Sequence, residues 1–195
     1  MGMSLKSYFR SSGYTRESLI QTEAGEFIEL SALSPFLRTL LIMDGTVTKS
    51  LSAWFWEPIT VEPQLNKLDV ASAPIVGLED LQDGDTVLHR DVILRGSHTR
   101  HLFACARSVV SLKHLPKNIS DALKKGEMGI GELLRENDVE TYRDIFEINY
   151  YLSSSEDDEL LCQLSGEIIS RSYRIRVKGV PAIIVTEYFP IDLYR

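Results

Sequence analysis

The chain has 195 residues and a formal net charge of −7, from 21 lysines and arginines against 28 aspartates and glutamates. Hydrophobic residues make up 44% of the chain and charged residues 25%, a composition typical of a globular domain that buries a core. The acidic balance argues against nucleic acid as the main partner, because phosphate binding requires a surplus of cations. It leaves an anionic small molecule open, since one or two well-placed groups suffice to bind one.

No stretch of the sequence approaches the roughly 18 apolar residues of a membrane span, and the N-terminus lacks the apolar segment of a signal peptide. These features predict a cytoplasmic protein without a membrane partner. Cys105 and Cys162 are too few for a disulfide framework and show no metal-binding spacing. His98 and His101 stand at a predicted turn without a third ligand nearby, so we expect no metal site there.

The first part of the chain predicts an arm, two helices and a strand. Residues 1–28 are polar and weakly patterned, which predicts a peripheral arm or helix, and the main domain is expected over residues 29–195. Residues 34–45 predict a helix, because a serine suits the N-cap, a proline the first turn and a glycine the end. A second short helix is predicted over residues 46–56, and an extended segment begins at about residue 59.

The remainder of the chain predicts two hairpins separated by helices. Apolar and polar residues alternate on both sides of a turn at residues 96–99, and again around a turn at residues 178–181. Residues 117–126 predict a helix closed by glycine, and another helical segment starts at about residue 130.

A further strand is predicted over residues 139–150, with one face formed by Tyr142, Phe146, Ile148 and Tyr150. The chain thus predicts about six strands, joined mainly as hairpins, with helices inserted in groups. Because neighbouring strands of a hairpin are antiparallel, the expected fold class is α+β: one six-stranded antiparallel sheet with helices packed mainly on one face.

Two charged residues stand on otherwise apolar strand faces. Every second residue around Arg90 and around Glu187 is apolar, namely Leu88, Val92 and Leu94 for the first and Ile183, Val185 and Phe189 for the second. Small side chains, Ala106 among them, occupy the strand that follows Arg90. Because a lone buried charge is costly, the two residues should either form a structural salt bridge or bind a ligand in the space beside the small residues.

Two glycine-containing segments are suited to binding an anion. Residues 126–134 place glycines directly before a helical pattern, and residues 43–49 follow a helix stop with the hydroxyls of Thr46 and Thr48. Free backbone N–H groups at the beginning of a helix bind carboxylates well. Glycines beside helix ends are also common as ordinary caps, which is the alternative for both segments.

Taken in order, several motifs resemble those of the chorismate lyase family. They are LL-x-x-DG-x-VT (40–48), RDVIL-x-G (90–96), FA-x-A-x-S (103–108), LP (115–116), MGIGE (128–132), ETYR (140–143) and RSYRIRVKGVPAIIVTEYFP (171–190). The resemblance covers about residues 30–190. It is greatest to the branch from archaea, cyanobacteria and actinobacteria that was long catalogued as a domain of unknown function.

The resemblance implies a six-stranded sheet with an internal ligand cavity, and conversion of chorismate to 4-hydroxybenzoate and pyruvate without metal or organic cofactor. Carried over by motif, it implies that Arg90 and Glu187 are the catalytic residues at the polar end of the ligand. It further implies that the backbone N–H groups of Val47 and Ile130 bind the ligand's carboxylate.

Thr48 and Ala106 are predicted as additional substrate-binding residues. The sequence departs from the enterobacterial pattern at Ala106, where those relatives have glycine, and at Val47, where they have methionine. Both changes should alter the shape of the pocket more than the reaction.

A different class of function shares the same fold. The closing hairpin is also similar to that of the effector-binding domains of GntR-type repressors, which would imply a sensor of a small acid without catalysis. No helix-turn-helix pattern precedes the domain in this sequence, which disfavours that alternative. A lyase relative that merely binds aromatic acids is the third reading, and the sequence does not indicate an oligomeric state.

Overall fold

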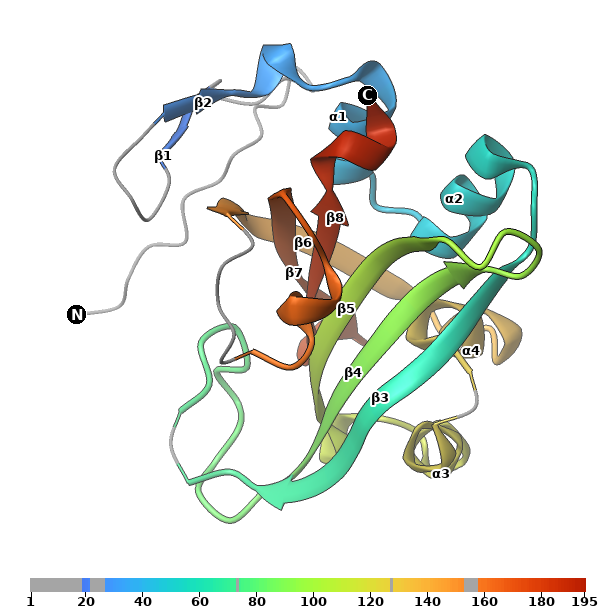
Figure 1. Ribbon diagram of the computed structural model, residues 1–195. Coiled ribbons are helices and arrows are strands. Elements are labelled where there is room, and N and C mark those ends of the chain that lie inside the picture. Colours follow the sequence, from blue (N-terminus) through green and yellow to red (C-terminus); the bar gives the residue numbers. More distant parts are fainter. Residues whose placement is uncertain (1–18, 22–26, 73, 127, 153–157) are drawn as a thin grey trace.

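The computed structural model describes residues 19–21, 27–72, 74–126, 128–152 and 158–195 (Figure 1). The predicted N-terminal arm lies mostly outside these residues. Of that arm, β1 (Leu19–Gln21) and β2 (Phe27–Glu29) pair as a short antiparallel ribbon. Within the described ranges, no helix is long and apolar enough to cross a membrane.

The domain is built on one six-stranded antiparallel sheet, which confirms the predicted fold class (Figure 1). Its strands are β3 (Ile59–Val70), β4 (Thr86–Gly96), β5 (Leu102–Ser111), β6 (Thr141–Leu152), β7 (Glu167–Val177) and β8 (Val180–Pro190). The strand order is β3-β4-β5-β8-β7-β6, with every neighbouring pair antiparallel. The two predicted hairpins, β4–β5 and β7–β8, therefore meet in the middle of the sheet, where β5 pairs with β8.

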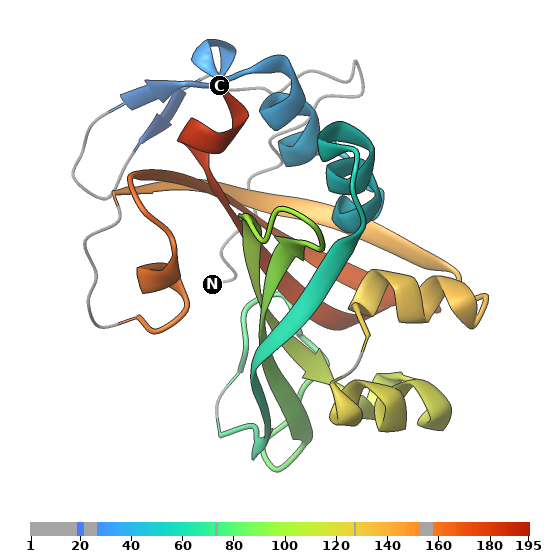
Figure 2. The same ribbon diagram turned by 45° about the vertical axis from the view of Figure 1, so that its right-hand side comes forward.

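Helices cover one face of this sheet, along one side of the view in Figure 2. They are α1 (Pro35–Ile42), α2 (Val47–Phe55), α3 (Lys117–Lys125) and α4 (Ile130–Glu136). α1 and α2 bury leucines such as Leu37 in a cluster with Phe189 of β8, whereas α3 buries Ile119 in a second cluster with Ile183 of the same strand. The stretch of β8 between these two clusters contains Glu187.

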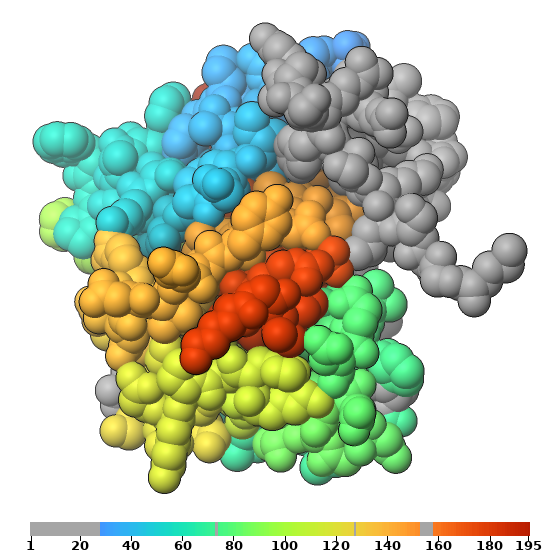
Figure 3. Space-filling model, turned by 180° about the vertical axis from the view of Figure 1, so that it is seen from behind, coloured from blue at the N-terminus to red at the C-terminus, as the bar shows by residue number. Residues whose placement is uncertain are grey.

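Loops rather than helices cover the opposite face. Residues of the segment 71–85, such as Leu78, form an apolar cluster with Ile184 of β8. In Figure 3 this green segment lies against the C-terminal hairpin, drawn in red. The short segment around Leu160 covers Ile93 of β4 in the same way. A strand of this sheet thus has both faces buried, which explains the nearly continuous apolar run in β8.

The predicted faces of β6 are wrong at its beginning. The strand has a register shift between Ile145 and Glu147, where one extra residue interrupts the pairing with β7. A bulge of this kind reverses the alternation of side chains. Tyr142 is consequently 67% exposed, although Ile148 is buried as predicted. The same bulge places Arg143 opposite Ile175 of β7, on the face that the helices cover.

Candidate active site

The pairing of the strands brings the predicted charged residues to one region of the helix-covered face. One row across the sheet contains Arg90, Ser108, Val185 and Tyr173, and the next contains Val92, Ala106, Glu187 and Arg171. Residues directly opposite one another share a face, so both rows point toward the helices. β4 and β8 are two strand spacings apart, which separates the backbones at Arg90 and Glu187 by about 10 Å or more.

Arg90 is buried, and its side chain binds backbone carbonyl groups. Its side chain is 2% exposed, and Nη2 donates to the carbonyl oxygens of Met128 at 2.6 Å and Gly126 at 3.3 Å. Nε has no hydrogen-bond partner, and no carboxylate pairs with this guanidinium in the part of the chain that the structure describes. Burial lowers the pKa of Arg90, because a low-polarity environment disfavours its charge. Among the described residues, the charge of this buried cation is therefore not neutralised by a carboxylate.

Glu187, in contrast, has a hydrogen-bond partner at each of its two carboxylate oxygens. Its Oε2 accepts a hydrogen bond from Nε of Arg171 at 2.7 Å, and its Oε1 accepts one from the hydroxyl of Tyr173 at 3.0 Å. Glu187 is 5% exposed and Arg171 is fully buried. Burial and the adjacent Glu187 charge raise the pKa of Tyr173, so its hydroxyl remains a neutral donor. The structural salt bridge between Arg90 and Glu187, one of the two sequence-based alternatives, is therefore not formed.

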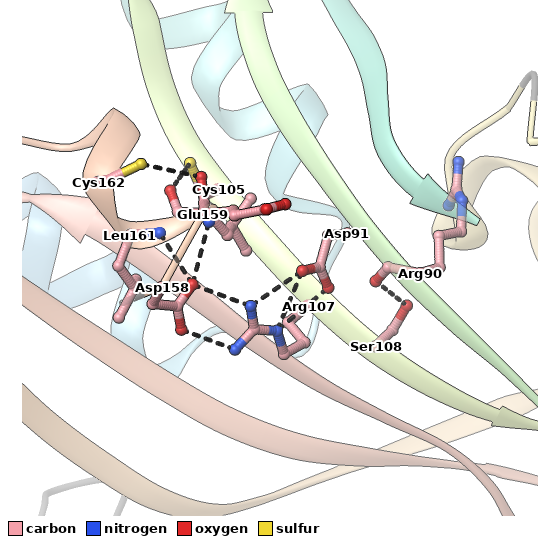
Figure 4. A network of polar contacts seen from close by, with 10 residues as sticks. Arg90, Asp91, Cys105, Arg107, Ser108, Asp158, Glu159, Leu161 and Cys162 are labelled. Atoms are coloured by element: carbon pink, nitrogen blue, oxygen red, sulfur yellow. Dashed lines mark hydrogen bonds and ion pairs between the residues drawn. The ribbon is translucent and has the colours of Figure 1, made fainter. Parts of the chain in front are cut away.

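Asp91, the residue next to Arg90 on β4, belongs to a network of ion pairs. Asp91 points away from Arg90, to the other face, where Arg107 binds both Asp91 and Asp158 (Figure 4). The Arg107 guanidinium lowers the pKa of Asp158, and the two carboxylates raise the pKa of Arg107. This second network is saturated and holds the loop at residues 158–164 against the sheet. Arg90, one residue away, pairs with no carboxylate in the ranges that the structure describes.

A pocket opens between the two charged rows and the beginnings of α2 and α4. All the residues predicted for the site line it: Arg90, Glu187, Val47, Thr48, Ala106 and Ile130. Its floor consists of strand residues that are mostly buried and apolar, apart from Arg90, Ser108 and Glu187, and its rim is formed by the segments 45–48 and 129–132 together with Arg143.

Both helices at the rim begin without a side-chain cap. The N-cap residues Thr46 of α2 and Gly129 of α4 make no capping hydrogen bond, whereas Ser34 of α1 accepts the N–H of Leu37 at 3.3 Å. First-turn N–H groups have no partner inside their own helix, so those of Val47 and Ile130 remain available at the pocket. Loop amides and a buried cation therefore flank one apolar space.

Sequence reasoning missed three residues of this region. Arg171 and Tyr173 share the parity of Ile175 on β7, so the alternation that revealed Glu187 also marks them as inward-facing. Arg143 could not be predicted, because the alternation of apolar and polar residues in the sequence does not reveal the bulge in β6. Arg171 and Arg143 also hold the loop before α2: their Nη1 atoms donate to the carbonyl oxygens of Met43 and Asp44, each at 2.6 Å.

Comparison with known proteins decides the family. Residues 41–195 match the family described as Rv2949c-like, chorismate pyruvate-lyase Rv2949c-like. The chain belongs to this chorismate pyruvate-lyase family. Its members are carbon–oxygen lyases, and the match includes every residue predicted for the site.

Named relatives agree with the family assignment. The chain is 32% identical over 172 residues to the chorismate pyruvate-lyase of Mycobacterium leprae, covering 86% of this chain and 80% of the relative. It is 27% identical over 172 residues to the chorismate pyruvate-lyase of Mycobacterium tuberculosis H37Rv, covering 86% of this chain and 85% of the relative.

Solved structures of another class share the fold of this chorismate pyruvate-lyase family member. PhnF from Mycobacterium smegmatis superposes with a TM-score of 0.59 at 12% identity, covering 77% of this chain and 66% of that protein. The effector domain of PhnF from the same organism gives a TM-score of 0.58 at 13% identity, covering 76% of this chain and 90% of the domain. At these identities the similarity concerns the fold alone.

Proposed function

We propose that this chain converts chorismate to 4-hydroxybenzoate and pyruvate without a cofactor, and that the pocket described above is its internal ligand cavity. The observation that carries the proposal is the buried charge of Arg90 in the pocket wall, which no carboxylate of the described residues neutralises. A lone cation in such a place is costly unless an anionic ligand compensates it. Chorismate is a dianion, and the family assignment supports it as the substrate.

The reaction requires little covalent chemistry from the protein. The bond between ring carbon 3 and the ether oxygen breaks, and the proton on ring carbon 4 leaves. The electrons of that carbon–hydrogen bond complete the aromatic ring. If the proton moves to the methylene carbon of the departing enolpyruvyl group, 4-hydroxybenzoate and pyruvate result without any further reactant. The enzyme then has to position the substrate and stabilise the charge that develops on the leaving group.

Arg90 is the proposed residue for that stabilisation. Its Nε is a buried donor with no hydrogen-bond partner among the described residues, and two carbonyl oxygens accept hydrogen bonds from its Nη2. A fixed cation in a site that excludes water interacts with developing charge more strongly than it would in water, and it requires no reorganisation during the reaction. We assign the ether oxygen or the carboxylate of the enolpyruvyl group to this guanidinium.

Glu187 is proposed to accept a hydrogen bond from the ring hydroxyl. Arg171 and Tyr173 already bind its two oxygens and fix its orientation, which suits a positioning role. The alternative role, as the base that removes the ring proton, stays open until tested.

The opposite end of the ligand is assigned to the rim of the pocket. The backbone N–H groups of Val47 and Ile130 would bind the ring carboxylate, with the Thr48 hydroxyl beside them. Ala106 lies next to Glu187 in the central strands, where its small side chain leaves space for the ring. The uncapped beginnings of α2 and α4 support this orientation.

The decisive experiment incubates the purified protein with chorismate and measures pyruvate and 4-hydroxybenzoate together. Equal amounts of both products, formed at a rate proportional to the protein concentration and above the spontaneous rate, support the lyase. Binding of 4-hydroxybenzoate without turnover would instead support an aromatic-acid sensor. The effector domain of PhnF has the same fold, so this second function is the alternative that the assay tests.

A further inference from the structure

Arg143 is a second cation at the same pocket, and neither the sequence motifs nor the assignments above give it a ligand. It comes from the edge strand β6, and the bulge after Ile145 turns it toward the helix-covered face. Its Nη1 donates to the carbonyl oxygen of Asp44 at 2.6 Å, which fixes the guanidinium at the rim of the pocket.

Along its remaining edge, this guanidinium forms no hydrogen bond with the described residues. Nε is buried and has no hydrogen-bond partner, and across the described ranges of the chain neither Nη2 nor the group as a whole is paired with a carboxylate. Arginines elsewhere on the sheet are neutralised, such as Arg95 by Glu62 and Arg174 by Asp144. Nε and Nη2 together form the edge with which arginine grips a carboxylate through two parallel hydrogen bonds.

The position of the Arg143 guanidinium relative to α2 and α4 indicates which carboxylate of the ligand it binds. A Cβ atom placed on Gly131 would lie 3.3 Å from Nη2 of Arg143 and 3.3 Å from the side chain of Thr46. The guanidinium therefore sits where the first turn of α4 approaches the N-cap of α2. Because residue 131 has no side chain, no Cβ atom of that residue occupies the space between Nη2 and Thr46. The neighbouring amides of Val47 and Ile130 are those assigned to the ring carboxylate.

We propose that Arg143 binds the ring carboxylate of the ligand through Nε and Nη2, and thereby determines how tightly the aromatic product is held. This inference rests on the proposed function for the identity of the ligand. It gives the dianionic substrate one cation at each end, Arg90 for the leaving group and Arg143 for the ring carboxylate. 4-Hydroxybenzoate keeps only the ring carboxylate, so Arg143 should matter for product affinity even after the leaving group has gone.

The test compares two ligands that differ in one charge. Calorimetry would measure binding of 4-hydroxybenzoate and of its neutral analogue 4-hydroxybenzamide to the wild type, Arg143→Met, Arg143→Lys and Arg135→Met. Arg135 is an exposed arginine on α4 that does not line the pocket, so its substitution removes the same charge nearby. Thermal unfolding of each variant checks that it is folded.

We expect Arg143→Met to weaken binding of 4-hydroxybenzoate by about 10- to 100-fold, as for loss of a charge-assisted pair of hydrogen bonds, and binding of 4-hydroxybenzamide by less than about threefold. Arg143→Lys should lie between wild type and Arg143→Met, since it keeps the charge without the two-pronged edge. Arg135→Met should change neither affinity by more than about twofold.

Three results would overturn the inference. Equal losses for both ligands would mean that Arg143 only holds the Asp44 loop, and unchanged affinities with an unchanged KM for chorismate would remove Arg143 from the site. A raised KM for chorismate with unchanged 4-hydroxybenzoate affinity would move Arg143 to the enolpyruvyl carboxylate. Failure of the lyase proposal is a separate result: a wild type that binds 4-hydroxybenzoate through Arg143 but releases no pyruvate keeps this inference and refutes catalysis.

Discussion

The substitution Arg90→Met tests whether the charge of Arg90 serves catalysis or the stability of the fold. Methionine keeps most of the length and apolar stem of arginine but removes the guanidinium. If Arg90 stabilises the departing enolpyruvyl group, losing one fixed donor should lower kcat/KM by about 10²- to 10³-fold, or about 2.7–4 kcal/mol of transition-state stabilisation. Steady-state assays that follow pyruvate and 4-hydroxybenzoate would measure this loss.

The same substitution should have little effect on folding. It removes the hydrogen bonds to the carbonyl oxygens of Met128 and Gly126, each worth about 1.5–3 kcal/mol with a charged donor. It also removes a buried cation with no negative partner within the described residues. Removing the desolvation cost of that charge stabilises the fold by an amount similar to what the lost hydrogen bonds cost. We expect the free energy of unfolding without ligand to change by less than about 2 kcal/mol, as measured by urea denaturation.

The outcome that refutes this reasoning is specific. Wild-type kcat/KM in a folded Arg90→Met protein would exclude Arg90 from the mechanism. A loss of activity that merely follows a loss of folded protein would make its role structural. Arg95→Met on the same strand is the matched control, because Arg95 binds Glu62 and does not line the pocket. This control should retain its kcat/KM.

Three further predictions concern the groups around the pocket and the reaction path. Arg171→Met leaves the charge of Glu187 buried without its cation, so it should lower the free energy of unfolding by about 3–5 kcal/mol in urea titrations. Adding Glu187→Gln should restore part of that loss. A change below about 1 kcal/mol, the value typical of an exposed ion pair, would contradict the burial of this pair. The pKa of Asp158 is lowered in the folded protein, so its pairing with Arg107 stabilises the fold fully above the unfolded pKa of about 3.9 and is lost as the pH falls through the folded pKa. The difference in unfolding free energy between wild type and Asp158→Asn should therefore be constant from pH 7 to about 5 and shrink below about 4. A difference that grows in acid would contradict this argument. Chorismate carrying deuterium on ring carbon 4 should deliver the label to the methyl group of pyruvate, as detected by mass spectrometry, whereas release of the label to water would assign the proton to a protein base such as Glu187.

Much of the fold follows from local alternation and turn chemistry. The hairpins around residues 96–99 and 178–181 were predictable because strand periodicity and glycine-containing turns are encoded within a few neighbouring residues. The inward direction of Arg90 and Glu187 follows from the same parity. The positions of the segments before α2 and α4 were indicated by glycines and by a family resemblance rather than by periodicity.

The partners of the charged residues could not be predicted in the same way. Glu187 pairs with Arg171 because β7 and β8 align those two positions in register, and register depends on the whole sheet. Arg90 and Glu187 stay apart because β5 lies between their strands, a result of the pairing of β5 with β8. Arg143 faces the pocket because of a bulge, which shifts every earlier residue of β6 to the other face.

The loop before α2 is tied to the sheet by Arg171 and Arg143, each through one carbonyl oxygen of consecutive residues. Arg171 also grips Glu187, so a single rigid side chain connects the group proposed to meet the ring hydroxyl with the segment proposed to meet the ring carboxylate. Selectivity at the two ends of the ligand is therefore not independent. Redesigning this protein for an aromatic acid with a different substituent opposite its carboxylate would require Glu187, Arg171 and the loop to change together. A single substitution at Glu187 should impair recognition of the ring hydroxyl and of the ring carboxylate at once.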